Sequence, residues 1–199
     1  GYIDKALAGG HATFEWMHRD SNGKEIPCEV WFSRLPAGDR KLIRVSITDI
    51  SDRKRIEALS YAQNKILEMI AASTPYERTL RSVCRFVERV GEGFRAAVME
   101  LDAKRQKLSL IEAPALPEAF KLGLGYVNVG PDSLTCGSAV HDQQDRISSD
   151  VHNDALWASL RAEADQANIA AVWSFLIYGA AGRSIGTFDV YVDEARAPN

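Results

Sequence analysis

Cys136 is the residue whose sequence surroundings best suit covalent chemistry. It follows Ser133-Leu-Thr, where a short helix is predicted to begin, and the partial positive charge of a helix N-terminus stabilises a thiolate. No second cysteine stands nearby for thiol exchange, and Cys84 falls on the apolar stripe of another predicted helix. We therefore favour packing in a tight turn for Cys136 and do not expect this chain to be an enzyme.

A loose group of imidazole and carboxylate side chains could in principle bind a metal. Its spacing matches no zinc or iron pattern, so we expect no metal site, and the sequence requires no cofactor. Asp150 fits better as a turn or capping residue before a helix. The group consists of His141, Asp142, Asp150, His152 and Asp154.

Large aromatic residues in the C-terminal half could stack on a planar ligand, although such residues more often belong to a core. The candidate ligand-binding residues are Cys136, His141, Asp150, Trp157, Trp173 and Tyr191. A cavity among residues 94–101, 136–141, 157 and 173–191 would favour binding of a small molecule. A closed core there would favour a module that binds no ligand.

The overall composition describes an ordinary globular protein. The chain has 199 residues, of which 46% are hydrophobic, and a formal net charge of -3, which argues against a nucleic-acid partner. No apolar run is long enough to span a bilayer, and the N-terminus lacks the pattern of a signal peptide, so we expect a cytoplasmic protein without membrane insertion. Three widely spaced cysteines fit reduced thiols.

The first fifty residues predict a small antiparallel sheet. A short helix is expected over residues 2–8, followed by alternating strands over 11–19, 24–35 and 41–50. Asn22-Gly23 suits a hairpin turn, and Pro36-Ala-Gly-Asp39 a second turn. The three strands should form a meander.

Residues 51–72 predict one long helix. Ser51 is a good N-cap residue, and no Gly or Pro interrupts the segment before Pro75. Its apolar residues fall at steps of three and four, which fits a short coiled-coil seam with one polar position. We favour a parallel contact with a second copy of the chain over packing on its own domain. The predicted signal-relay residues are Asp49, Ile56, Leu59, Gln63, Ile66 and Ile70.

The remaining residues predict an α+β domain, in which helices flank a mainly antiparallel sheet. Pro75 should lie early in a helix that ends near Gly91. Strands are expected over 94–103, 107–113, 146–151, 171–178 and 184–192, with a helical turn over 116–120 and a short helix from Cys136. One amphipathic helix, capped by Asn153 or Asp154, should carry Leu156, Trp157, Leu160, Ala164 and Ala167.

The N-terminal pattern closely resembles the second half of a PAS domain. The resemblance rests on FEW, the Asn-Gly turn, PCEVWFS and VSITDISDRKRIE. The exit motif Asp-Ile-Thr-x-Arg-Lys is matched by Asp49, Ile50, Ser51, Arg53 and Lys54, with Ser in place of Thr. The resemblance implies a partial PAS domain over 1–50, whose missing first half would leave one sheet face uncovered. We expect that face to pack on another chain, the helix or the following domain, and expect no flavin, haem or small-acid ligand there.

The C-terminal pattern resembles a GAF domain of the bacterial sensor type, with the domain over 73–199. The matching segments are SLTCGSA, ISSDVHNDALW, VWSFLIY and SIGTFDVYV. Such domains are sensory or dimerisation modules, found beside PAS domains and upstream of cyclic-di-GMP enzymes or histidine kinases. A bilin-attaching cysteine and the cyclic-nucleotide signature Asn-Lys-Phe-Asp-Glu are absent, and methionine sulfoxide reductases of this family use several cysteines around the pocket.

These patterns predict a sensory and regulatory module that works as a homodimer. A small-molecule or redox input would change the paired helices and reach an output domain beyond Asn199. A dimerisation module that binds no ligand is the alternative, and a GAF-type thiol enzyme is a third possibility.

Overall fold

The computed structural model describes residues 1–36, 40–104 and 106–198, which form two compact units. The first unit comprises residues 1–64 and the second residues 65–199. Helix α2 (Ser51–Ala71) begins in the first unit and ends in the second. Of the turn predicted at Pro36-Ala-Gly-Asp39, residues 37–39 lie outside the described residues.

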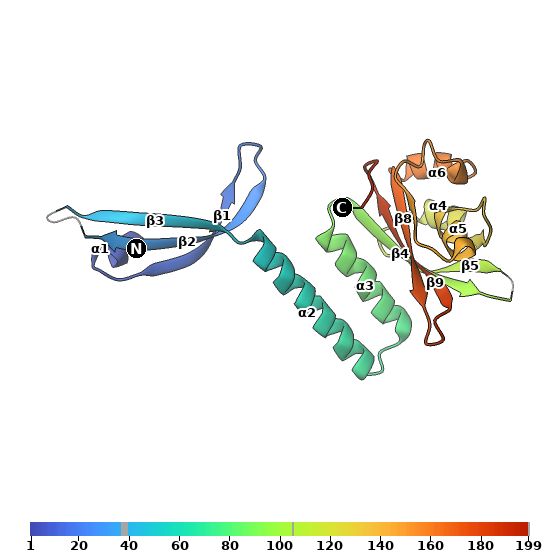
Figure 1. The fold of residues 1–199 in the computed structure, drawn as a ribbon, viewed down its shortest axis with the longest axis horizontal. Coiled ribbons are helices and arrows are strands. Elements are labelled where there is room, and N and C mark those ends of the chain that lie inside the picture. The colour runs from blue at the N-terminus through green and yellow to red at the C-terminus, as the bar shows by residue number, and fades with distance from the viewer. Residues whose placement is uncertain (37–39, 105, 199) are drawn as a thin grey trace. The chain divides into compact units, whose positions relative to one another are not determined.

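The first unit contains a short helix and a three-stranded antiparallel sheet, as the alternation predicted (Figure 1). Its elements are α1 (Tyr2–Leu7), β1 (Ala12–Arg19), β2 (Glu25–Leu35) and β3 (Leu42–Asp49), with the strands in the order β1-β2-β3. The β1–β2 turn is built as expected: Asp20 Oδ1 accepts hydrogen bonds from the N–H groups of Asn22 and Lys24, and Gly23 has a φ of +83°.

One face of this sheet is strongly apolar, because the register places Phe14 opposite Val30 and Val30 opposite Ile47. Helix α1 covers part of it, with the Tyr2 ring stacked on Phe14 at 4.2 Å between ring centroids. Trp16 remains 62% exposed and Ile47 56% exposed in the single chain. The strand assignment is confirmed, and a partner that covers this face stays a prediction.

Helices α2 and α3 (Tyr76–Val90) both form where the sequence predicts them. Their N-terminal details differ from expectation. Asp49, rather than Ser51, accepts the capping hydrogen bond, from the Ser51 N–H at 2.8 Å, and Pro75 is the N-cap of α3, directly before its first turn. None of the helices in the described ranges combines the length and the apolar character that a bilayer crossing requires.

The second unit is built on a six-stranded antiparallel sheet with the strand order β6-β5-β4-β9-β8-β7. The two long C-terminal strands pair with each other, and β9 also pairs with β4, so the last strand lies in the middle of the sheet. The strands are β4 (Phe94–Asp102), β5 (Lys107–Glu112), β6 (Tyr126–Asn128), β7 (Arg146–Ser148), β8 (Ala171–Tyr178) and β9 (Ser184–Val192).

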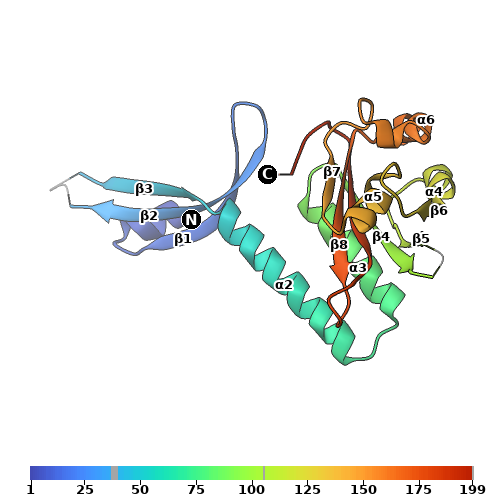
Figure 2. The same cartoon turned by 45° about the vertical axis from the view of Figure 1, so that its right-hand side comes forward.

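Helices cover both faces of this sheet, which confirms the α+β class (Figures 1 and 2). Helix α3 lies over one face, where Cys84 packs with Ala96 and Val98. The other face carries the main core, and the elements that enclose it are α4 (Glu118–Leu124), α5 (Thr135–Asp142), the 3-10 helix η1 (Ala155–Trp157) and α6 (Arg161–Gln166).

The region after β7 departs most from the sequence-based expectation. The single helix predicted from Asn153 or Asp154 is wrong, because η1 and α6 are separate and Leu160 between them has φ -125° and ψ 11°. The break lets Trp157 and Leu160 both enter the main core, so tertiary burial outweighs helix continuity. Strand β7 also stops at Ser148, and β6 was not predicted.

Candidate functional site

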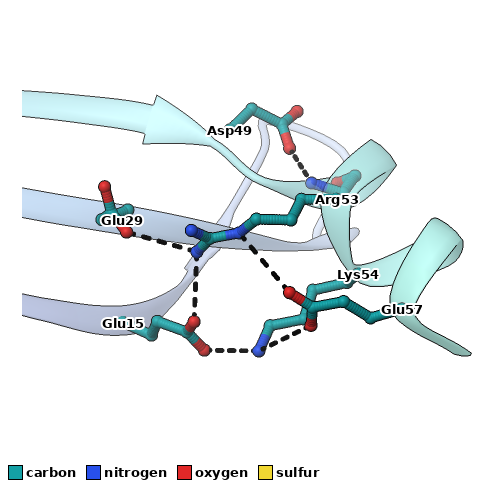
Figure 3. A network of polar contacts seen from close by, with 7 residues as sticks. Glu15, Glu29, Asp49, Arg53, Lys54 and Glu57 are labelled. Carbon is teal, nitrogen blue, oxygen red and sulfur yellow. Dashed lines mark hydrogen bonds and ion pairs between the residues drawn. The ribbon is translucent and has the colours of Figure 1, made fainter. Parts of the chain in front are cut away.

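The start of α2 is tied to the first sheet by an ion-pair network (Figure 3). Arg53 Nη2 donates hydrogen bonds to Glu15 Oε1 at 3.1 Å and to Glu29 Oε1 at 3.2 Å. Glu15 lies on β1 and Glu29 on β2, where the two residues face each other in the register. One guanidinium therefore bridges two strands and the first turn of the helix.

Lys54 completes the network from the next helical position. Its Nζ lies 2.6 Å from Glu15 Oε2 and 3.9 Å from Glu57 Oε2. The hydrogen bond from Lys54 lowers the pKa of Glu15, and hydrogen bonding from Ser51 lowers the pKa of Asp49. Both carboxylates are thus held in the charged form, and the predicted motif residues Asp49, Arg53 and Lys54 all contact the junction between sheet and helix.

The predicted apolar stripe of α2 is largely exposed in the single chain. Ile56 is 63% exposed and Ile70 60% exposed, and Leu59 and Gln63 are also exposed. Ile66 is half-buried. An aligned row of exposed aliphatic side chains is unfavourable in water, so this stripe is a candidate contact surface.

Three of the candidate ligand-binding residues meet in the main core of the second unit. Trp157, Tyr191 and Cys136 are all buried there. The Trp157 ring stacks on Phe120 at 6.4 Å between centroids, and Phe120 meets Tyr191 edge-on at 5.6 Å. The aromatic rings therefore pack against one another and fill this part of the interior.

Both cysteines of the second unit are buried. Burial raises the pKa of Cys136 well above its usual range, although the residue lies in the first turn of α5. Burial also raises the pKa of Cys84 to about 12. Desolvation thus outweighs the helix dipole, and neither group supplies a thiolate nucleophile at neutral pH in this conformation.

His141 lies apart from the buried aromatic residues, at the exposed end of α5. Its Nδ1 lies 2.8 Å from Asp142 Oδ1, and Asp142 also pairs with Arg146 at 3.3 Å. His152 pairs instead with Asp165 at 3.0 Å. Across the described residues, no group of three or more His, Cys, Asp or Glu side chains lies close enough to hold a metal.

Asp150 makes a turn, the role that the sequence favoured for it. Its Oδ1 accepts a hydrogen bond from the His152 N–H at 2.9 Å, and its Oδ2 accepts one from Asn153 Nδ2 at 2.7 Å. The Asn153 hydrogen bond lowers the pKa of Asp150. Asp154 then caps η1 by accepting from the Leu156 N–H at 3.0 Å.

Trp173 is separated from Trp157 by the sheet itself. It packs on the α3 side, edge-on to Phe94 at 5.3 Å, and its Nε1–H donates to the carbonyl of Arg196 at 3.0 Å. The Arg196 guanidinium also lies 5.9 Å from the Trp173 ring centroid. Trp173 therefore holds the C-terminal segment, and the two tryptophans do not form one stacking site.

An open groove of about 560 Å³ lies on the α4 side of the second unit. Sequence reasoning missed it because its wall includes β6, which is too short to show a periodic pattern. The groove is lined by Gly123, Leu124, Tyr126, Val127, Asn128, Gly130, Pro131, Asp132, Ser133, Leu134, Leu156, Ser159 and Leu160.

A second feature missed from the sequence is Asp189 on β9. Its side chain is 0% exposed, and burial raises its pKa to about 7. It shares a sheet face with Tyr191, and the neighbouring hydroxyls of Ser174 and Thr187 are buried as well. The available signal was the acidic residue itself within the apolar run SIGTFDVYV.

Known proteins resemble this chain mainly over its second unit. A family model described as GAF domain matches residues 73–199. The "Methyl sulfide methyltransferase-associated sensor" of Methanosarcina acetivorans is 28% identical over 152 residues. That match covers 76% of this chain, which spans only 15% of the length of the relative.

Two solved structures share the fold at low sequence identity. A GAF sensor protein from Burkholderia vietnamiensis is 15% identical with a TM-score of 0.57. The match covers 73% of this chain and 84% of the Burkholderia chain. Free methionine-R-sulfoxide reductase from Neisseria meningitidis, solved with its substrate, is 16% identical with a TM-score of 0.54. The match covers 72% of this chain and 79% of the reductase chain. The sensor relatives support a sensory module, and the reductase shows that the same fold also serves an enzyme.

Proposed function

Because this chain belongs to the GAF domain family over residues 73–199, we propose that it is the sensory and regulatory part of a larger cytoplasmic signal-transduction protein of bacterial type. Residues 1–50 would be the C-terminal part of a PAS domain, and residues 51–72 the helix that joins it to the GAF domain. Input in either domain would change the pairing of two α2 helices and so reach an output domain outside this chain.

The exposed stripe of α2 is the observation that carries this proposal. Ile56, Leu59 and Ile70 stand exposed on a helix whose start is fastened to the sheet through Arg53 and Lys54. A second copy of the helix would bury the stripe, and a change of register would repack discrete side chains. A movement of β1 or β2 would be transmitted to the helix through the carboxylates of Glu15 and Glu29.

The oligomeric state tests the proposal directly. Native mass spectrometry and light scattering of the 199-residue chain should both report a dimer. The mass spectrum should also reveal any retained small molecule. Leu59→Glu places a charge on the stripe and should yield a monomer that keeps its GAF fold. Asn64→Glu is the matched control, because residue 64 is exposed on another side of the helix and should leave the dimer intact. A wild-type chain that stays monomeric at high concentration would refute the relay.

A ligand-silent dimerisation module is the second candidate. Phe120, Trp157 and Tyr191 pack against one another in the interior, and a closed core of this kind favours the ligand-silent module. This alternative would be supported if the dimer, purified from cell extracts, retained no small molecule. Its melting temperature should then also stay unchanged across a panel of metabolites. A thiol enzyme is disfavoured, because Cys84 and Cys136 are buried with raised pKa values.

A further inference from the structure

A group of unpaired polar side chains lies inside the GAF domain. Ser174, Thr187 and Asp189 are each 0% exposed. Among the described residues, none of their side-chain oxygens has a hydrogen-bond partner of ordinary geometry, although the hydroxyls of Ser174 and Thr187 lie close enough to Asp189 to offset part of the rise that burial causes in its pKa. In the strand register Asp189 faces Ser174 on β8 and Ala97 on β4. Thr187 is two residues before Asp189 and so shares its face of the sheet.

Such a cluster is costly in an otherwise apolar core. Buried polar groups in native proteins are nearly always hydrogen-bonded, and a buried carboxylate without donors is especially unfavourable. Ala97 stands across from Asp189, whereas Met99 on β4 and Leu176 on β8 stand across from Thr187. Helix α5, which packs on β8 and β9, is buried along residues 135–140. The cluster has acceptors and hydroxyls, and it lacks a partner that brings several N–H donors.

We propose that Asp189, Ser174 and Thr187 form a buried subsite for the protonated amine of a small ligand held inside the GAF domain. This inference rests on the proposed sensory function and names the chemical class of its input. The carboxylate would accept two N–H groups of the ammonium, and the hydroxyl oxygens would accept the third. The ligand's positive charge would balance the one buried negative charge of the cluster.

The surroundings of Asp189 suit a cation bound through N–H donors. The titratable groups close to it are the Cys136 thiol on α5 and the Tyr191 phenol on β9, and burial raises the pKa of each, so both stay neutral at pH 7. Cys84, on the α3 side, is neutral as well. One carboxylate and two hydroxyls offer too few oxygens for a calcium or magnesium ion, which takes six or more.

None of the three cluster residues lines the open groove, so a ligand that enters there would reach the cluster only after a movement of the segment between them. Leu134 lines the groove and directly precedes α5, whose first turn carries Cys136. Asp189 is close enough to Cys136 for its charge to raise the pKa of that thiol. A shift of the first turn of α5 would therefore connect the groove to the cluster, and the body of the ligand would occupy the groove side.

Thermal unfolding of the full chain with simple ammonium salts tests the subsite. Methylammonium chloride is the probe, because it carries a positive charge and three N–H donors. Tetramethylammonium chloride has the same charge and no N–H, and sodium chloride controls for ionic strength. At pH 8, methylammonium should raise the unfolding temperature at concentrations up to about 0.3 M, and the two control salts should not. At pH 5.5 the rise should shrink, because Asp189 becomes protonated.

Variants connect this effect to the cluster. Asp189→Asn should abolish the methylammonium-specific rise, and Ser174→Ala should reduce it by half or more. Asp52→Asn, at a side chain that is 94% exposed, should retain it in full. An equal rise in Asp189→Asn and wild type, or no rise above sodium chloride in the wild type, would overturn the subsite.

The outcome can be separated from that of the dimer proposal. Leu59→Glu should keep the methylammonium-specific rise, since the cluster lies within the GAF domain. A chain that is dimeric but does not respond to methylammonium would overturn the subsite and leave the relay standing. A monomer that does respond would refute the relay and support the subsite.

Discussion

The Nε1–H of Trp157 donates a hydrogen bond to Oγ1 of Thr135 across 2.7 Å, between two fully buried residues. Thr135 begins α5 and Trp157 ends η1, so this bond joins two segments that the chain otherwise connects through β7 and a turn. Phe120 of α4 stacks on the same indole. The contact thus holds α5 in place over the sheet, above the residues in which we infer ligand binding.

Replacing Trp157 by Phe should destabilise the GAF domain by about 1–3 kcal/mol, because the Thr135 hydroxyl is left buried without its donor. Thr135→Val should lower the free energy of unfolding by a similar amount, because the indole N–H is left buried without an acceptor. In the double variant neither polar group remains, so the combined loss should be smaller than the sum of the two single losses. Urea denaturation of the four proteins measures this cycle, and strictly additive losses would show that the bond contributes nothing.

Arg53→Gln should loosen the beginning of α2 with little loss of global stability. The ion pairs it makes with Glu15 and Glu29 are solvent-exposed, and exposed pairs contribute at most about 1 kcal/mol each. Hydrogen exchange of the amides in residues 51–57 should nevertheless become faster, because the guanidinium anchors that turn to two strands. Arg55→Gln is the control, since Arg55 contacts only Asp52 at 3.9 Å in the described ion pairs. Equal exchange in both variants would argue against an anchoring role.

The buried acid Asp189 should make stability fall as pH rises. Burial raises its folded-state pKa to about 7, whereas the unfolded chain has the ordinary value of 3.8. The folded state therefore holds the proton more tightly, and stability from this group is full below pH 3.8 and lost progressively between pH 4 and 7. The slope is about 1.4 kcal/mol per pH unit in that window.

Asp189→Asn removes that dependence, so the variant should gain stability relative to wild type from pH 4 to 7 and keep a constant advantage above pH 7. The difference in free energy of unfolding between the two proteins, measured by urea titration at several pH values, isolates Asp189 from other titrating groups. A difference that does not vary with pH would mean that Asp189 is ionised at a normal pKa.

The cysteines should resist alkylation until the protein unfolds. All three are buried, and a pKa of about 12 for Cys84 lowers its thiolate population about 1,000-fold relative to a thiol of pKa 9. Mass spectrometry after treatment with a neutral maleimide should show slow labelling of Cys84 and Cys136 in native protein and rapid labelling in urea. Labelling of native Cys136 as fast as a model thiol would restore the enzyme hypothesis.

Local patterns alone were enough to predict most elements of this protein. Alternation predicted the three-stranded meander and both C-terminal strands, with Ala171–Tyr178 and Ser184–Val192 found as expected. The absence of Gly and Pro predicted α2. These elements follow from backbone preference and hydrophobic period, which are properties of consecutive residues.

Which residues lie in the interior of the GAF domain depends on tertiary packing. Alternation along β9 puts Thr187 and Asp189 on one face, a pattern typical of a solvent-facing side, yet α5 covers that face and buries both. The predicted helix through Trp157 and Leu160 is broken because both side chains enter the core together. Sequence by itself determined most of the helices and strands, apart from β6 and the break at Leu160. Only the packing of helices on both sheet faces decided that the Asp189 carboxylate would be buried beside two hydroxyls, since burial depends on what other segments cover a residue.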